Sequence, residues 1–342
     1  MPRRDLVVVG ASAGGVEALR DLVSELPADL PACVLVVLHL PSAAFSALSV
    51  ILARATSLTV ATAYDGAPLA NGRIFVAPPD RHLVVRDGHV ALGRGPKENG
   101  HRPAIDPLFR SAARWRGPNT IGVILSGTLD DGAAGLLSLT ERGGLAVVQD
   151  PQSAAYDGMP SAALRAVPDA KVAAGPALAA LVASLCGEAV SVDAVDPVRR
   201  LDLEADIARL DEEALAAKDR PGRPAALTCP DCNGAMFEID DGNLVRYRCR
   251  VGHAWSPDTL LFEQVEMAEA ALWAAIRTLE EKAALHRKMS ARAQGEHKLL
   301  GQRYHDEQAE AADSSASVLR DLLRRPLTGD APDLPPILEA DG

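Results

Sequence analysis

A serine lies in a glycine-rich turn near the start of the chain, in Gly10-Ala-Ser-Ala-Gly-Gly15. The turn follows an apolar run and opens a helix-compatible stretch, which is the strand–turn–helix context of a nucleophile elbow. Such a turn lifts the Ser12 hydroxyl clear of a sheet, and the helix N-terminus offers N–H groups to a developing oxyanion. Two other interpretations stay open: Ser12 as a helix cap, or the glycines as a phosphate cradle. A dinucleotide cradle expects an acidic residue about 20 positions later, where the chain has Leu38-His-Leu-Pro41.

A histidine and an aspartate follow two further apolar runs. His39 ends one run, and Asp131 comes shortly after another. A serine hydroxyl is a weak nucleophile until a neighbouring base takes its proton, and a carboxylate fixes the tautomer of that base. Because the carboxyl ends of parallel strands share one edge, Ser12, His39 and Asp131 are predicted to meet there. Taken singly, His39 also fits a strand-end turn, and Asp130 or Asp131 fits a cap of the helix that starts near Gly132.

Three cysteines and a histidine form two knuckles, Cys229-x2-Cys232 and, after sixteen residues, Cys249-x3-His253. This spacing places four soft ligands within tetrahedral reach of one Zn²⁺. We expect a closed structural site whose metal supplies folding energy to a segment with little core of its own. An odd total of five cysteines fits a metal site in a reducing compartment better than a disulfide framework. The weaker alternative, a redox Cys-x-x-Cys pair, leaves Cys249 and His253 unexplained.

Strand-like and helix-like stretches alternate over residues 1–188. Apolar runs rich in Val, Ile and Leu predict buried strands, and the stretches between them have helix-compatible spacing. The strands are 6–9, 32–38, 73–77, 120–125 and 145–148, and the helices are 16–25, 107–115, 132–142 and 160–166. This alternation predicts an α/β fold, a doubly wound and mostly parallel sheet with helices on both faces. A small hairpin is expected where Asp87-Gly88 separates two short strands.

The composition changes after residue 188. We expect a catalytic domain over 1–188, a charged helical linker over 189–226 and a zinc-ribbon-like β module over 227–256. The Ala-, Leu- and Glu-rich composition of residues 257–326 predicts a helical tail. It is either one long helix or a hairpin whose helix breaks near Gly295 or Gly301. The Pro- and Asp-rich residues 327–342 predict disorder.

Charge and hydropathy exclude several classes of protein. The net charge of −11 is uneven, with 16 basic against 17 acidic residues over 1–188 and 19 against 29 over 189–342. An acidic C-terminal half lacks the basic stripe that nucleic-acid binding needs. No apolar run approaches the ~20 residues of a membrane span. The strand-like Leu6–Val9 leaves no room for a signal peptide. We therefore expect a cytoplasmic protein that is not embedded in a membrane.

Several blocks, in order, resemble the catalytic domain of the chemotaxis protein-glutamate methylesterase (CheB) family over residues 4–185. They are Val7–Gly15, Val36–Pro41, Ile74–Leu83, Arg102–Ala113, Leu125–Gly135 and Val148–Pro160. The resemblance implies a role in signal transduction, with hydrolysis of glutamyl methyl esters and deamidation of glutamines on chemoreceptor-like helices. It also implies a triad of Ser12, His39 and Asp131, with Asp130 outside it and no cofactor for catalysis.

The chain departs from the family pattern in three ways. Ala13 stands where the family has Thr, and Gly127-Thr-Leu129 stands where it has Gly-Met-Gly. The family's receiver domain does not precede the matching segment, so control by aspartyl phosphorylation within this chain is not expected. A rival hypothesis is a non-catalytic adaptor that binds receptor-like helices while the zinc ribbon recruits a partner. The complete triad argues against the adaptor, whereas the changes at Ala13 and Thr128 keep that hypothesis open.

Overall fold

The structure, a computed structural model, describes residues 2–39, 46–190, 199–216, 222–242 and 244–324. The segment predicted to be disordered, 327–342, lies outside the described residues, as do Leu40 and Pro41 and parts of the predicted linker. The chain divides into two compact units, 1–260 and 261–342, and each is described by itself. The proposed division into five segments stays a prediction.

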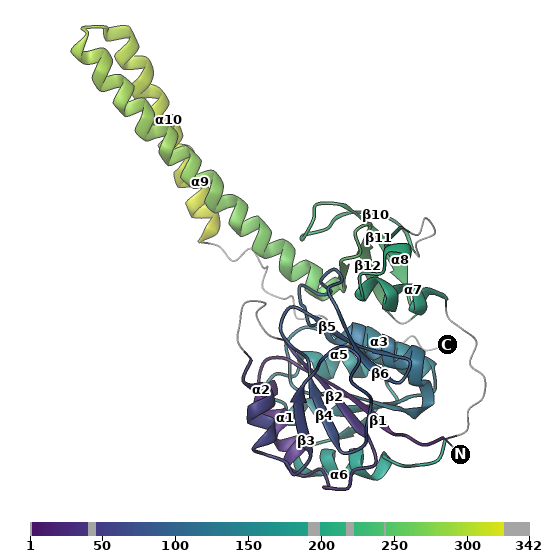
Figure 1. Ribbon diagram of the computed structural model, residues 1–342. Helices are drawn as coiled ribbons and strands as arrows, with labels where there is room; N and C mark the ends of the chain where they lie inside the picture. Colours follow the sequence, from purple (N-terminus) through teal and green to yellow (C-terminus); the bar gives the residue numbers. More distant parts are fainter. Residues whose placement is uncertain (1, 40–45, 191–198, 217–221, 243, 325–342) are drawn as a thin grey trace, which may run out of the picture. The chain divides into compact units, whose positions relative to one another are not determined.

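A seven-stranded parallel sheet forms the centre of the first unit (Figure 1). Its order is β3 (Thr59–Thr62), β4 (Arg73–Val76), β2 (Cys33–Leu38), β1 (Leu6–Ala11), β7 (Thr120–Ile124), β8 (Leu145–Gln149) and β9 (Lys171–Ala173). The chain builds outward from β1 through β2 in one direction, and later through β7 in the other. The strand order therefore reverses between β1 and β7, where open α/β sheets bind their ligands at the carboxyl ends of the strands.

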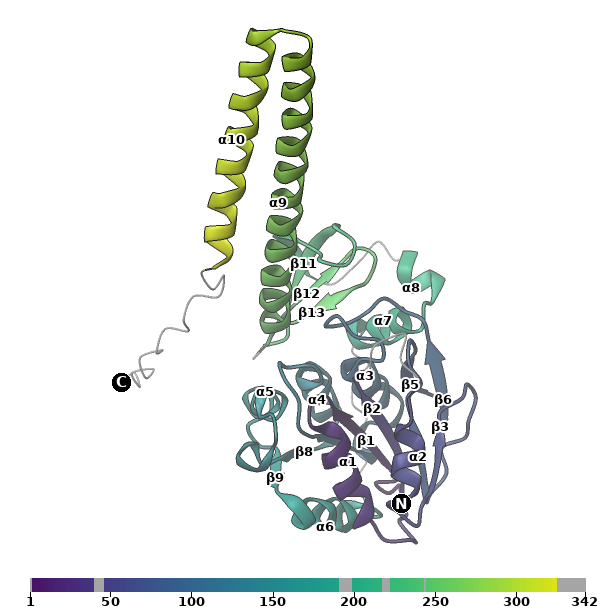
Figure 2. The same cartoon turned by 90° about the vertical axis from the view of Figure 1, so that its left-hand side faces the viewer.

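Helices cover both faces of this sheet, because successive side chains of a buried strand point to opposite sides. On one face, Leu6 and Val8 pack in a core with α3 (Ile105–Arg116), α4 (Ala133–Glu141) and α5 (Gly158–Ala166). On the other face, Val7 and Val9 pack with α1 (Gly15–Ser24), α2 (Leu48–Ala53) and α6 (Gly175–Leu185). Figure 2 shows the two helical layers with the strands between them. The predicted doubly wound fold is confirmed.

The predicted hairpin is also present. It consists of β5 (His82–Arg86) and β6 (His89–Gly93). At its turn Asp87 and Gly88 have φ values of 45° and 75°, the left-handed pair that a type I′ turn requires. Two short 3₁₀ turns, Gly117–Asn119 and Pro151–Ser153, complete the connections around the sheet.

The remainder of the first unit adds two helices and a second sheet. The helices are α7 (Arg199–Ala208) and α8 (Glu212–Ala216). The antiparallel sheet contains β10 (Arg223–Thr228), β11 (Ala235–Asp240), β12 (Val245–Cys249) and β13 (Ala254–Trp255), in that order. We call residues 223–260 the ribbon module. Its small core joins Met236, Trp255 and Leu260 to Cys229 and Cys249.

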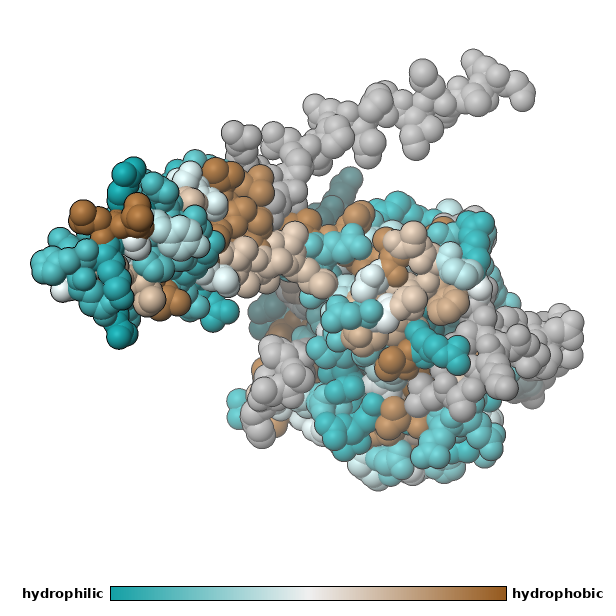
Figure 3. Space-filling view, turned by 90° about the horizontal axis from the view of Figure 1, so that it is seen from above, coloured by the Kyte–Doolittle hydropathy of each residue, from teal (hydrophilic) through white to brown (hydrophobic). Residues whose placement is uncertain are grey.

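The second unit is a helical hairpin. Its helices are α9 (Pro257–Gly295), which starts at the end of the first unit, and α10 (Leu299–Leu323). The chain reverses after Gly295, as predicted for one of two positions, whereas Gly301 lies within α10. Most side chains buried in this hairpin are small, which lets the two helices approach closely. Within the second unit the buried residues are Ile276, Ala283 and Ser290 of α9 and Ala309, Ala312 and Ala316 of α10. Figure 3 shows hydrophobic patches among the hydrophilic surface of this hairpin. No helix in the described ranges is both long enough and apolar enough to span a membrane.

Candidate active site and metal centre

The turn after β1 holds Ser12 at the carboxyl edge of the sheet. Gly14 has a φ of 68°, and a Cβ added there would lie 2.8 Å from the Ser126 Oγ, so the turn requires glycine. The Ser12 N–H donates to the Ser126 carbonyl over 2.9 Å, and the Ser126 hydroxyl donates to the Ala13 carbonyl over 2.8 Å. No side chain caps α1. The interpretation of Ser12 as a helix cap is therefore wrong, and its half-buried hydroxyl is free for other chemistry.

Ser12, His39 and Asp131 form a chain of hydrogen bonds. Nδ1 of His39 lies 3.1 Å from Ser12 Oγ, and Nε2 lies 2.7 Å from Asp131 Oδ2. With its proton on Nε2, His39 donates to Asp131 and turns the Nδ1 lone pair toward the serine hydroxyl, as a general base must. The two ring nitrogens exchange roles relative to the chymotrypsin-type triad, where Nε2 faces the serine. The predicted meeting of the three residues is confirmed, while their catalytic roles stay a proposal.

Asp131 lies at the N-terminus of α3. Its Oδ2 accepts the Ile105 N–H over 2.7 Å, and its Oδ1 accepts the Asp106 N–H over 3.3 Å and an Asn99 Nδ2–H over 3.0 Å. Burial alone raises the pKa of Asp131, but the hydrogen bond and charge of His39 and the Ile105 N–H outweigh it and hold the pKa well below its ordinary value. Asp131 is thus an anion at the positive end of a helix dipole.

The N-terminus of α3 lies close to Asp131 because the residue of β1 that faces Ile105 is a glycine, Gly10. A Cβ added to Gly10 would lie 2.4 Å from Ile105 Cγ2. Any larger residue at position 10 would push the first turn of α3 away from the sheet edge. The glycine that begins the Ser12 turn therefore also sets the distance between Asp131 and its donors.

Two residues beside the triad escaped the sequence analysis. The ring of His101 stacks on that of His39, with centroids 3.7 Å apart and planes 16° apart. Burial and the neighbouring His39 lower the pKa of His101 to about 4, so this ring is neutral near neutral pH. Asn99 is buried and donates to Asp131. His101 immediately precedes one of the blocks that carry the family resemblance, which was the one available signal, and the sequence offered none for Asn99.

Asp130 faces different partners from its neighbour. Its Oδ1 accepts the Ser256 hydroxyl over 2.5 Å and the Thr259 hydroxyl over 2.9 Å. Burial raises the pKa of Asp130, although these two hydrogen bonds oppose that effect. Neither aspartate caps α4, whose N-cap is Gly132 with no side-chain hydrogen bond. The interpretation of Asp130 or Asp131 as a cap of the helix that starts near Gly132 is therefore wrong; Asp131 instead accepts the first N–H groups of α3.

The surroundings of Ser12 include a free donor and a buried thioether. The Ala13 N–H donates to no acceptor in the part of the chain that the structure describes. A Cβ added to Gly127 would lie 2.9 Å from Ser12 Cβ and 2.1 Å from the Sδ of Met159, so Met159 of α5 packs beside the nucleophile turn. Thr128 is exposed. Leu129, in the position of a family glycine, has a φ of 60°, a conformation that costs a non-glycine residue about 1–3 kcal/mol.

Known proteins share the segment that carries this site. The profile described as CheB methylesterase matches residues 7–182, about half of the chain. The chain belongs to the CheB methylesterase family. The matching residues include Ser12, His39, Asn99 and Asp131 and stop short of the ribbon module.

Curated relatives and a solved structure extend this assignment. A protein-glutamate methylesterase/protein-glutamine glutaminase 1 from Xanthomonas euvesicatoria is 43% identical over 164 residues, 47% of this chain and 46% of that protein. The protein of the same name from Anaeromyxobacter dehalogenans is 46% identical over 165 residues, 47% of each. The crystal structure of the Thermotoga maritima CheB methylesterase catalytic domain matches with a TM-score of 0.51 and 31% identity, over 53% of this chain and 98% of that one. The chain spans about half the length of the curated relatives it matches.

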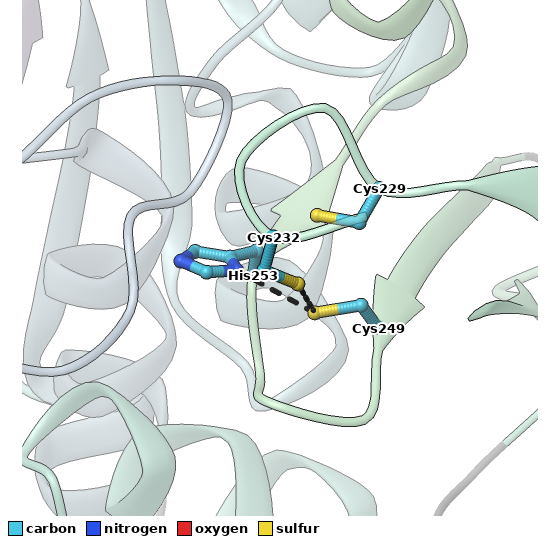
Figure 4. A group of neighbouring side chains, drawn as sticks. All are labelled: Cys229, Cys232, Cys249 and His253. Atoms are coloured by element: carbon cyan, nitrogen blue, oxygen red, sulfur yellow. Dashed lines mark hydrogen bonds between the residues drawn. The ribbon is translucent and has the colours of Figure 1, made fainter. Parts of the chain in front are cut away.

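The cysteine–histidine cluster converges at one end of the ribbon module (Figure 4). Ligand atoms of Cys229, Cys232, Cys249 and His253 all lie within 4.8 Å of one another. The Cys232–Cys249 sulfur separation is 3.6 Å, and Cys249 Sγ lies 3.5 Å from His253 Nδ1. A tetrahedral zinc has ligand–ligand edges of about 3.5–3.8 Å, so these separations fit the ion.

Two neighbouring groups also suit a metal. His253 turns Nδ1 toward the sulfurs, while its Nε2 faces Asp231 Oδ2 at 3.9 Å. A carboxylate behind the outer nitrogen is the usual way in which proteins orient a ligating histidine. The hydrogen bond with Cys229 lowers the pKa of Cys249 to about 7, so a thiolate, the form that binds metals, is accessible at neutral pH.

Proposed function

We propose that this chain is a serine hydrolase of the protein-glutamate methylesterase type. It hydrolyses glutamyl methyl esters, and deamidates glutamines, on chemoreceptor-like helices in chemotaxis signalling in the cytoplasm. The single observation that carries the proposal is the hydrogen-bonded chain Ser12–His39–Asp131 at the switch point of a CheB-family sheet. The names of the relatives supply the substrate class.

The geometry suggests the order of events. Ser12 Oγ attacks the ester carbonyl while its proton passes to Nδ1 of His39, and Asp131 stabilises the resulting imidazolium. The oxyanion accepts the free N–H of Ala13 at the N-terminus of α1. His39 returns the proton to the leaving oxygen, so methanol departs and a glutamyl ester of Ser12 remains. Water then hydrolyses that ester by the same steps, and with a glutamine substrate ammonia departs in place of methanol.

The rival hypothesis, a non-catalytic adaptor, gives the triad no task. Three features support hydrolysis instead. The ionised Asp131 is held by four donors, a neutral ring packs flat on His39, and the donor beside Ser12 has no protein partner among the described residues. Burial of an ionised carboxylate is costly, and a binding surface alone would not need it.

Methanol release from methylated receptor membranes tests the proposal. Ser12→Ala should abolish turnover and change the thermal midpoint little, because the nucleophile is lost and the fold loses only the part-buried hydrogen bond with His39. Ser24→Ala is the matched control, since Ser24 is an exposed residue of the following helix that only bonds the Asp21 carbonyl. Wild-type turnover by Ser12→Ala would refute the assignment of the nucleophile, and an inactive wild-type protein would favour the adaptor.

We also propose that Cys229, Cys232, Cys249 and His253 bind one structural Zn²⁺, which supplies no catalytic chemistry. The closed four-ligand set and the carboxylate behind His253 support it. A metal-free redox pair is the alternative that the sequence left open.

Elemental analysis of the purified chain should give one zinc per chain. Cys232→Ser should lose the metal, because three ligands hold zinc more weakly than four. Cys186→Ser should keep it, because this buried free cysteine lies outside the cluster. A metal content near zero after expression with zinc would rule out the site.

A further inference from the structure

A five-residue loop, Lys97–His101, brings two side chains against the candidate triad. Asn99 donates to Asp131 Oδ1 over 3.0 Å, and His101 stacks on His39. Asn99 has a φ of 50° and Gly100 has one of 74°, a left-handed pair that turns the chain sharply between the two contacts. The loop comes before α3 and is closed by two main-chain hydrogen bonds between Glu98 and His101. These bonds fix its turn but not its place against the triad, which depends on contacts with other parts of the protein.

The ribbon module fixes it through main-chain and side-chain hydrogen bonds. The Asn99 N–H donates to the Ala254 carbonyl over 2.8 Å, and the Ser256 N–H donates to Asn99 Oδ1 over 2.8 Å. The Trp255 ring lies beside Gly100, 3.8 Å from where a Cβ would stand. The side-chain oxygen of Asn99 therefore accepts a hydrogen bond from the module, while its side-chain nitrogen donates to Asp131.

Buried charges hold the same loop from a second direction. Glu98 accepts hydrogen bonds from Arg110 of α3 and from Arg248 of β12, at 2.5 Å and 3.1 Å. Arg248 and Arg246 also pair with Glu204 of α7, at 3.3 Å and 3.0 Å. All five side chains are buried. Loop, module and α7 therefore share one network of ion pairs that no solvent separates.

The metal-ligand set is continuous with these contacts along the chain. His253 is followed directly by Ala254, Trp255 and Ser256, three residues that touch the loop in addition to Arg248. β13 has two residues; it pairs with β12 through Tyr247–Trp255 and Arg248–Ala254, and Ala254 also forms a bridge with Glu98 of the loop. Such a short strand has little stability of its own, so its position depends on the knuckle formed by Cys249 and His253.

We propose that the ribbon module is a built-in support of the active site, and that Asn99 is the positioning residue through which the module holds Asp131. The inference rests on the proposed hydrolase function and adds to it a role for the C-terminal segment in turnover. Asn99 does not touch Ser12 and acts only through Asp131. A displaced Asn99 leaves Asp131 short of a donor, and the His39 ring loses its fixed orientation.

The test uses the whole 342-residue chain and p-nitrophenyl acetate as the substrate. Asn99→Gly keeps the left-handed backbone and removes all three side-chain hydrogen bonds, those donated to Asp131 and Asp106 and the one accepted from the Ser256 N–H. We expect kcat per folded protein to fall roughly 10- to 100-fold, the effect of one hydrogen bond to a charged group, with KM unchanged. The acid limb of the pH–rate profile should move to higher pH, because Asp131 with one donor fewer binds the imidazolium more tightly. The control Asp87→Gly removes another left-handed side chain, in an exposed turn, and should change none of these quantities.

A double-mutant cycle tests the role of the ribbon module. Cys232→Ser should lower kcat in the same way as Asn99→Gly. Chelation of the wild-type protein, with the released metal measured by a chromophoric indicator, should also lower kcat, and added zinc should restore it. Combined with Asn99→Gly, Cys232→Ser should add little, since both act through one hydrogen bond. Effects that multiply, or an unchanged kcat in Asn99→Gly, would overturn the inference. Ser12→Ala distinguishes failure of this inference from failure of the proposed function, because turnover that survives this substitution would refute the serine hydrolase assignment itself.

Discussion

Two adjacent aspartates offer a sharp comparison, because they share a loop and differ in partners. In Asp131→Asn one carboxylate oxygen becomes an NH₂ group, yet both oxygens accept two donors in the wild type. If the NH₂ replaces Oδ2, it faces the Ile105 N–H and drives the His39 proton from Nε2 to Nδ1, which then cannot accept from Ser12. If it replaces Oδ1, it faces the Asn99 amide and the Asp106 N–H. Either placement leaves buried donors unpaired, at about 1–3 kcal/mol each.

The wrong tautomer and the lost charge should together reduce kcat about 10³–10⁴-fold, equivalent to about 4–5.5 kcal/mol. Asp130→Asn keeps its Oδ1, and the Ser256 and Thr259 hydroxyls can still donate to it, so its loss should stay below about tenfold. Steady-state hydrolysis of p-nitrophenyl acetate, with thermal unfolding as the check on folding, measures both variants. Equal losses, or a larger loss in Asp130→Asn, would refute the assignment of Asp131 and the argument from donors.

Two further predictions concern buried charges. Burial and the neighbouring Asp131 raise the pKa of Asp106 to about 8, so its contribution to stability is full below about pH 4 and is lost as the pH rises through about 8. As the pH rises across this window, the free energy of unfolding of Asp106→Asn should therefore increase relative to that of the wild type by up to about 1.4 kcal/mol per pH unit. Urea unfolding at several pH values measures this difference, and a difference that does not depend on pH would contradict the raised pKa. Glu204→Gln removes the negative charge that pairs with buried arginines, so it should lower the free energy of unfolding by about 3–5 kcal/mol. Chemical denaturation measures this loss, and a loss below about 1 kcal/mol would show that water reaches the network.

The sheet and the meeting of the three residues followed from local pattern. Strands such as β1 and β2 are buried on both faces and read as continuous runs of Val and Leu, and parallel strand ends share an edge. The strands that escaped prediction, β3 and β9, lie at the edges of the sheet and are partly exposed. Their side chains alternate or mix with polar residues, so no apolar run marks them.

Other features could not come from one sequence. The spacing of cysteines indicated the ligand cluster, because ligands of a knuckle are neighbours along the chain. Asn99 touches Asp131, 32 residues away, and Ser256, 157 residues away, and neither spacing has a periodic signal. The strand-end argument brought Asp131 to the edge, and the family resemblance placed its neighbour Asp130 outside the triad. The partners themselves, His39 for Asp131 and Ser256 for Asp130, come from the structure.

The buried ion pairs bear on why the module is placed where it is. Arg110, Arg246 and Arg248 carry three positive charges, and Glu98, Glu204 and Asp241 carry three negative ones, while Asp106 keeps its proton below about pH 8. Desolvation of such groups offsets most of their attraction, so replacement of a buried ion network by apolar side chains often leaves stability unchanged. A displaced module, however, would leave charges buried without partners, which is strongly unfavourable. The network therefore selects one position for the ribbon module, and that position is the one in which Ser256 reaches Asn99.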